Sequence, residues 1–87
     1  MSVHGEFQRV LAELVGDLRA TQHATCQRSA DALETLATSA RDDLDAAARS
    51  ALEICAGPAP AELSAGQRER IEARAGHLAA ICRALVG

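Results

Sequence analysis

Hydrophobic side chains recur at three- and four-residue steps along most of the chain, which is the spacing of an amphipathic helix. The first such stretch covers about residues 2–20, the second about residues 29–56 and the third about residues 65–86. No stretch alternates with the period of two that a half-buried strand requires. We therefore expect a single all-α domain over residues 1–87.

The clearest interruption is a turn at residues 57–64, which holds both prolines of the chain. Gly57 stands where helix ends commonly adopt the left-handed conformation, and a proline cannot continue a helix. Ser64 and Gln67 then match a capping box that begins a new helix. This turn predicts that the helices on its two sides pack against each other as an antiparallel hairpin.

The two helices that flank this turn carry matching seams of mostly small side chains. The seams follow the alternating four- and three-residue steps of a coiled coil, and alanine at such positions lets two helix axes approach closely. The hairpin seam consists of Leu33, Ala37, Ala40, Leu44, Ala47, Ala51, Ile54, Ile71, Ala75, Leu78, Cys82 and Leu85.

The first helix has the strongest apolar face, and this face needs a partner. The last helix extends only about 33 Å back from the turn, at about 1.5 Å per residue, and so reaches no further than the mid-thirties of the chain. We expect the face of the first helix to project uncovered and to act as an interaction face. It consists of Val3, Phe7, Val10, Leu11, Leu14 and Leu18.

Residues 21–28 decide how the first helix is covered. They include no large apolar residue and several weak helix formers, but no Gly or Pro that would force a break. We favour a continuous or kinked helix here, so that two chains complete a four-helix dimer by covering each other. The alternative is a turn, which folds the first helix back and gives a three-helix bundle within one chain.

Composition supports an oligomer or a protein partner. Of the 42 apolar residues, 20 are alanines, which bury little surface each and leave a thin core for one chain. Lys, Asn, Tyr and Trp are absent and all nine cations are arginine, which indicates codon bias in a GC-rich, bacterial genome.

Charge and hydropathy argue against two classes of partner. The net charge of −3 argues against nucleic acid, whose binding depends on phosphate neutralisation. The longest apolar run is far shorter than the ~20 residues that span a bilayer, and an acidic first helix disfavours binding to a membrane surface. Without a basic region and apolar core at the N-terminus, we expect a cytoplasmic protein whose three cysteines are reduced.

Metal binding has weak candidates in His23 and Cys26, which share one helical face. A structural zinc site needs four ligands, and the other candidates are scattered. In a straight hairpin Cys55 and Cys82 would lie about 30 Å apart, too far for a disulfide. We expect no metal and no cofactor, and assign the cysteines to apolar packing.

Catalysis has no support in the sequence. The chain contains no glycine-rich phosphate loop, no nucleophile elbow and no placed pair of carboxylates. A chain this small and alanine-rich also does not predict a deep pocket, so we expect no small-molecule substrate and no enzymatic activity.

The favoured hypothesis is thus a non-catalytic adaptor, small subunit or inhibitor that self-associates as a homodimer or binds another protein. Pro60, Glu62, Leu63 and Gln67, following the alanine-rich seam, resemble the helix–loop–helix of phasins, which coat polyester granules. That resemblance implies an alternative, a granule or membrane surface coat protein. A second alternative is a thiol- or metal-responsive sensor that uses His23 and Cys26.

Overall fold

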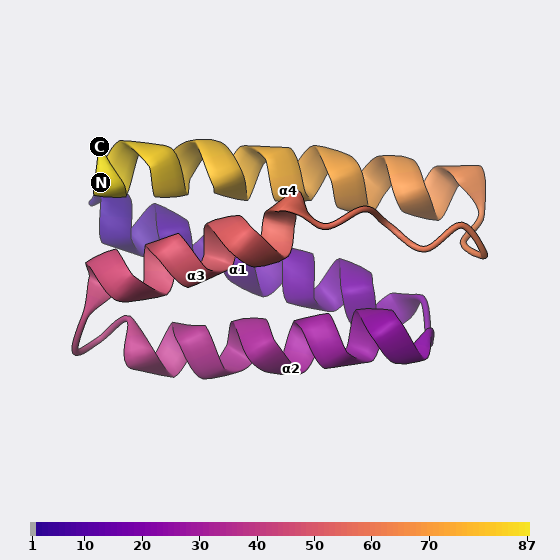
Figure 1. Cartoon of the computed structure of the whole chain (residues 1–87), viewed down its shortest axis with the longest axis horizontal. Helices are drawn as coiled ribbons and strands as arrows, with labels where there is room; N and C mark the ends of the chain where they lie inside the picture. The colour runs from indigo at the N-terminus through magenta and orange to yellow at the C-terminus, as the bar shows by residue number, and fades with distance from the viewer. Residues whose placement is uncertain (1) are drawn as a thin grey trace.

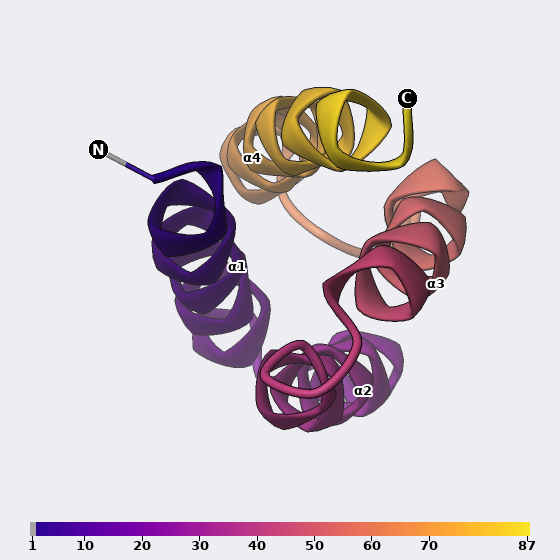
Figure 2. The same cartoon turned by 90° about the vertical axis from the view of Figure 1, so that its left-hand side faces the viewer.

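The computed structural model describes residues 2–87, which form four helices of alternating direction (Figure 1). Each helix packs against the next in the chain, and the first also packs against the last, so that the four stand at the corners of a square when viewed from the end (Figure 2). The bundle measures 35 × 20 × 20 Å. The helices are α1 (Val3–Ala20), α2 (Ala24–Ser39), α3 (Leu44–Ala56) and α4 (Ala65–Val86). The expected all-α helical bundle is confirmed.

The expected continuation of the first helix through residues 21–28 is wrong, because polar side chains make a turn there without Gly or Pro. The Thr21 hydroxyl donates to a carbonyl in the last turn of α1 (2.7 Å) and accepts from the backbone N–H of His23 (3.2 Å). Gln22 adopts the left-handed conformation, with φ of 56°. His23 then caps α2 by accepting from the backbone N–H of Thr25 through Nδ1 (3.2 Å).

The expected single helix over residues 29–56 is also divided. α2 ends at Ser39 and α3 begins at Leu44, because the Asp43 carboxylate accepts the backbone N–H of Ala46 (3.1 Å) and caps a new helix. The seam keeps its regular spacing across this turn only because the seam residues before and after the turn both face the core. One chain therefore forms a four-helix bundle, one helix more than the three-helix alternative.

The turn before α4 matches its sequence signal in one respect and differs in another. The capping box is present: the Gln67 N–H donates to the Ser64 hydroxyl (3.2 Å), and the Ser64 N–H donates to the Gln67 side chain (3.1 Å). Gly57 is not left-handed, however, but extended, with φ of −70° and ψ of 143°. Pro58 accounts for this, because a proline drives the preceding residue into the extended region.

The expected interaction face of the first helix lies inside the core of its own chain. The turns fold α2 and α4 against α1, so no second copy is needed to cover this face. Phe7 and Val10 have no exposed surface, and Val3 alone remains exposed, at 50%. The side chains of this face that the core buries are Phe7, Val10, Leu11, Leu14 and Leu18.

All twelve hairpin-seam side chains are buried or half-buried, but they do not form one interface. The α3 part of the seam packs against α4, whereas the α2 part lies at the corner diagonally opposite α4 (Figure 2). Residues 2–87 include no buried polar or charged residue, so the core is entirely apolar. None of their helices is both long enough and apolar enough to cross a membrane.

Candidate functional site

The bundle has an irregular side because α3 is too short to cover α4. α3 has 13 residues and α4 has 22, which correspond to about 20 Å and 33 Å of helix. The extended segment of residues 57–63 runs along the first half of α4 in place of further helical turns (Figure 1). The segment fills less space than a helix would, and a cavity remains beside it.

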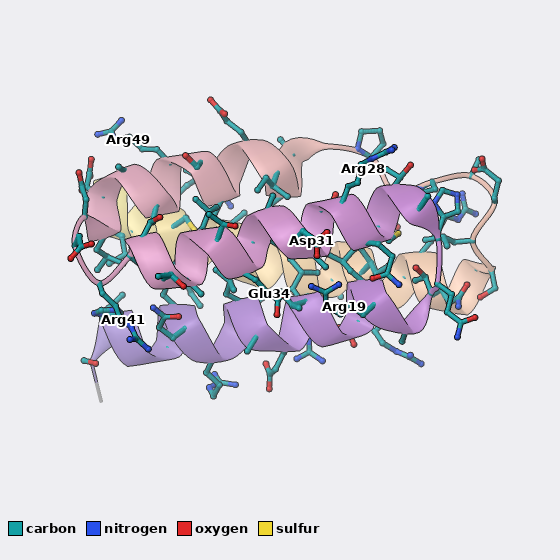
Figure 3. The ribbon with its side chains drawn as sticks, turned by 90° about the horizontal axis from the view of Figure 1, so that it is seen from below. Arg19, Arg28, Asp31, Glu34, Arg41 and Arg49 are labelled. Atoms are coloured by element: carbon teal, nitrogen blue, oxygen red, sulfur yellow. The ribbon has the colours of Figure 1, made fainter. Side chains whose placement is uncertain are left out.

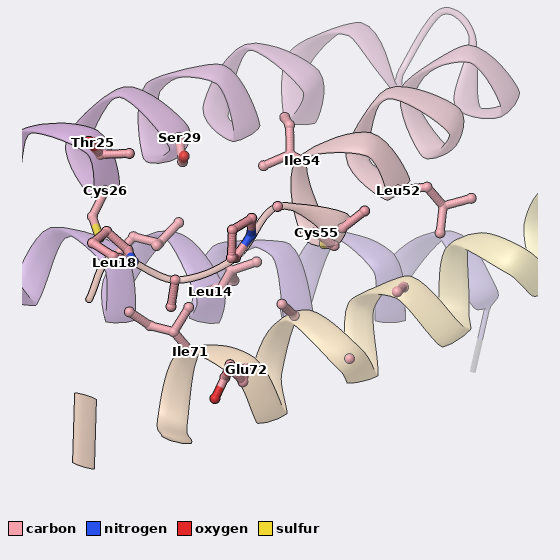
Figure 4. Close-up of a pocket in the computed structure, with 18 of the residues that line it drawn as sticks. Leu14, Leu18, Thr25, Cys26, Ser29, Leu52, Ile54, Cys55, Ile71 and Glu72 are labelled. Atoms are coloured by element: carbon pink, nitrogen blue, oxygen red, sulfur yellow. The ribbon is translucent and has the colours of Figure 1, made fainter. Parts of the chain in front are cut away.

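This cavity, which we call the loop pocket, has a volume of about 780 Å³. Cavities of about 300–1,000 Å³ are the usual size for binding sites, so the expectation that this chain has no sizeable pocket is wrong. All four helices and the segment after α3 contribute to the walls (Figure 4). The lining residues are Leu14, Leu18, Thr25, Cys26, Ser29, Leu52, Ile54, Cys55, Ala56, Gly57, Pro58, Ala59, Pro60, Ile71, Glu72, Ala75, Gly76, Ala79 and Arg83.

The lining of the loop pocket is mostly apolar, with Thr25 and Ser29 of α2 contributing its two hydroxyl groups. Leu18 of α1 and Cys26 of α2 lie together at one end, and Leu52 of α3 lies toward the other end (Figure 4). Leu52 and Ile54 are only half-buried. The pocket therefore holds apolar surface that the bundle leaves unpacked.

The middle of the pocket wall formed by α4 carries only small side chains. Gly76 is exposed, and a Cβ atom added there would meet no atom within 4 Å. Ala75 and Ala79 flank it, so nothing larger than a methyl group projects from the middle of this wall. Glu72 and Arg83 line the same wall and are exposed. A ligand or protein segment that binds along α4 therefore contacts small side chains that lie between two opposite charges.

Two of the three cysteines line the pocket, and all three are free thiols. Burial raises the pKa of Cys55 from near 9 to about 11, and the neighbouring Cys82 adds to the rise. Burial also raises the pKa of Cys82. A thiol with a raised pKa carries little thiolate at neutral pH and is a weak nucleophile.

The expected separation of Cys55 and Cys82 by about 30 Å is wrong. The extended segment, rather than α3, lies beside the first half of α4, so the C-terminal end of α3 falls beside the middle of α4 (Figure 1). Cys55 lines the pocket together with Ala79. Because residues 57–63 span the first half of α4, the two thiols are close enough for Cys82 to influence the pKa of Cys55.

The two weak candidates for metal binding, His23 and Cys26, both have structural roles. His23 caps α2 through Nδ1, and its Nε2 lies 3.9 Å from a carboxylate oxygen of Glu62. Cys26 is 1% exposed and packs in the core. Within residues 2–87 no three His, Cys, Asp or Glu side chains are grouped so that they could hold a metal ion.

Ion pairs fasten α1 to α4 on the side of the bundle away from the pocket. Arg74 donates to Asp17 (3.1 Å) and to Glu13 (2.9 Å), and the bond to Asp17 is the main reason that its pKa is raised. His77 Nε2 lies 3.7 Å from a carboxylate oxygen of Glu6. These contacts join residues that are far apart in the sequence and fix which face of α4 is turned toward α1.

A second set of ion pairs fastens α1 to α2. Arg19 donates to Asp31 (2.9 Å) and to Glu34, and the three side chains lie together between the two helices (Figure 3). Arg28 and Arg41, labelled in the same view, form no ion pair within residues 2–87. Four of the nine arginines, Arg9, Arg19, Arg49 and Arg74, form ion pairs within residues 2–87.

The sequence contains a signal for the pocket that the periodicity does not reveal. Antiparallel helices are usually joined by loops of about two to five residues, whereas residues 57–64 form a longer connection that begins with Gly and contains two prolines. A long, proline-stiffened loop in a small bundle indicates that one helix is shorter than its neighbour. No family model, no curated protein and no solved structure matches this chain.

Proposed function

We propose that the chain is a non-catalytic protein–protein interaction module that binds its partner through the loop pocket. The observation that carries the proposal is the pocket itself, an apolar cavity of about 780 Å³ in a chain of 87 residues whose other large apolar side chains are mostly packed. An open apolar site on an otherwise well-packed small domain is typical of an interaction surface.

A protein suits this pocket better than a small molecule does. Small-molecule sites fix their ligand with a few convergent polar groups inside the cavity. Here the polar side chains that line the pocket, Thr25, Ser29, Glu72 and Arg83, are exposed or half-buried, and none is buried. The pocket thus offers apolar contact in its interior and charge on its α4 wall, which matches the apolar centre and polar rim of protein interfaces.

The two alternatives lose their support. A granule or membrane coat needs an exposed apolar helix face, and the strongest such face, that of α1, lies in the core. A thiol or metal sensor based on His23 and Cys26 needs accessible side chains, whereas Cys26 is 1% exposed in the core and His23 caps α2. The three free thiols support a reducing compartment, and we place the protein in the bacterial cytoplasm.

The test compares two leucine substitutions at exposed helical glycines. Gly76→Leu puts a side chain into the loop pocket, and Gly16→Leu puts the same side chain on α1, outside the pocket. A Cβ meets nothing within 4 Å at either position, and a helix favours leucine over glycine, so both variants should fold. Circular dichroism checks this.

Immobilised protein is then exposed to a bacterial lysate, and the retained proteins are identified by mass spectrometry. The proposal requires a protein that wild type and Gly16→Leu retain and that Gly76→Leu loses. Equal retention by all three would contradict it, and so would the absence of any retained protein from a chain that is also monomeric.

A further inference from the structure

The α4 wall of the loop pocket has a symmetry that points to a particular partner. We call Glu72, Gly76, Ala79 and Arg83 the α4 strip; all four line the pocket. At about 100° per residue, these positions fall within a helical face roughly 60° wide. The strip thus presents an acid at one end, two small residues in the middle and a base at the other end.

The strip is complementary to itself when it is reversed. Glu72 and Arg83 stand equally far from the midpoint between residues 77 and 78, and so do Gly76 and Ala79. When two α4 helices lie antiparallel with these midpoints aligned, each Glu72 faces the Arg83 of the other copy. Each Gly76 then faces an Ala79. This is the pattern of an isologous two-fold contact, in which one patch binds the same patch on a second copy.

Both end charges are available for such a contact. No ion pair within 4.0 Å joins Glu72 or Arg83 to another of residues 2–87. This includes Arg68, one helical turn from Glu72, although that spacing often gives a pair. By contrast, Arg74 on the α1 side of the same helix is bonded to Asp17 and Glu13. The two charges that line the pocket are thus free of partners within residues 2–87.

The middle of the strip allows close approach. Helix axes pack about 8–10 Å apart, and the distance depends on the side chains at the contact. With Gly76 exposed and open space at its Cβ position, a facing helix can come to the short end of that range. The partner helix also covers Leu52 of α3, which is half-buried and lines the pocket.

We propose that the occupant of the loop pocket is a second copy of this chain, with the two α4 helices antiparallel along their strips. This rests on the proposed function and names the partner of the same site. An occupant must present a cation and an anion at the spacing of Glu72 and Arg83, about 17 Å along the helix, with small side chains between them. A second α4 meets this requirement, because its strip has the same residues at the same spacing.

The experiment reverses the charges one at a time in the full chain. Glu72→Arg and Arg83→Glu each replace two attractive pairs of the dimer with two repulsive ones, which corresponds to roughly a tenfold weaker association. When the two variants are mixed, a heterodimer regains both attractive pairs. Sedimentation velocity and native mass spectrometry over a dilution series measure the dimer fraction.

The expected result is a wild-type dimer, weakened in each single variant and restored in their equimolar mixture. Gly76→Leu should be monomeric, whereas Gly16→Leu should dimerise like wild type. A wild-type chain that is monomeric at every concentration overturns the second-copy proposal, and so does a dimer that is insensitive to charge reversal and to Gly76→Leu. A small apolar molecule that remains bound to the monomer in native mass spectra also overturns it.

These outcomes separate this proposal from the proposed function. If the chain is monomeric but Gly76→Leu still abolishes capture of a different protein, the second copy is excluded and the interaction module stands. If the monomeric chain also captures nothing through the pocket, both proposals fail.

Discussion

Replacing Phe7 by alanine tests the arrangement of the core directly. Phe7 has no exposed surface in the monomer. Burying an aromatic side chain contributes about 1.5–3 kcal/mol, and the cavity left behind brings the usual cost of Phe→Ala to about 3–5 kcal/mol. A domain of this length has a free energy of unfolding of roughly 4–13 kcal/mol. The substitution should therefore remove a large part of the stability of the chain.

The assay is urea unfolding followed by far-ultraviolet circular dichroism at two widely separated protein concentrations. Because the structure buries Phe7 within its own chain, the loss caused by the substitution should be the same at both concentrations. Val3→Ala is the matched control on the same helix, because Val3 is 50% exposed, and it should change the stability by less than about 0.5 kcal/mol. If Phe7→Ala does not fold, Phe7→Leu should cost roughly 1–2 kcal/mol.

Two results would refute this reasoning. A loss below about 1 kcal/mol for Phe7→Ala would mean that the side chain is not buried in a packed core. A loss that depends on protein concentration would mean that Phe7 lies between two chains, because subunit association makes apparent stability concentration-dependent. The second result would restore the dimer that the amphipathic pattern of the first helix predicts.

Three further predictions concern the caps, the ion pairs and the thiols. Ser64→Ala should cost about 1 kcal/mol in urea unfolding, because the capping box of α4 is lost, whereas Ser50→Ala on the exposed face of α3 should cost nothing; equal effects would contradict this. Arg74→Met should destabilise the chain at low salt and less at high salt, because the pair with Asp17 is partly exposed and screened; a salt-independent loss would contradict this. Stability should fall as the pH rises from about 9 to about 11, because the folded chain retains the Cys55 proton that the unfolded chain loses. The chain has no Lys or Tyr to titrate in that range, so Cys55→Ala should reduce the fall, and an unchanged fall would contradict the prediction.

Sequence alone determined the elements whose causes are local. The amphipathic period marks α1 almost to its ends, and the capping box at Ser64 places the start of α4 correctly. Such signals are reliable because the hydrogen bonds that they imply join residues only three or four positions apart. The antiparallel packing of α3 and α4 follows from the same local information, since the two prolines must end one helix before the next begins.

The turns at Thr21–His23 and at Asp43 show where local information is insufficient. Threonine, glutamine, histidine and aspartate occur in helices as well as in caps, so their presence does not distinguish a turn from a continuing helix. The choice depends on whether reversing the chain covers the apolar faces on both sides. Here it does: the reversals bring α2 and α4 against α1, and its apolar face, Phe7 included, is buried.

The tertiary structure decides the candidate site, and the long connection at residues 57–64 is its one signal in the sequence. The sequence shows that Gly76 and Ala79 are small and that Glu72 and Arg83 are charged, but the amphipathic pattern does not show that they line a cavity. That depends on the length of α3 relative to α4 and on the path of residues 57–63, which are set by packing among elements distant in the sequence. The sequence determined where the helices are, because helices are stabilised by their neighbours along the chain. Only the tertiary structure decided which faces are inside and where the cavity remains, because burial is shared among all four helices.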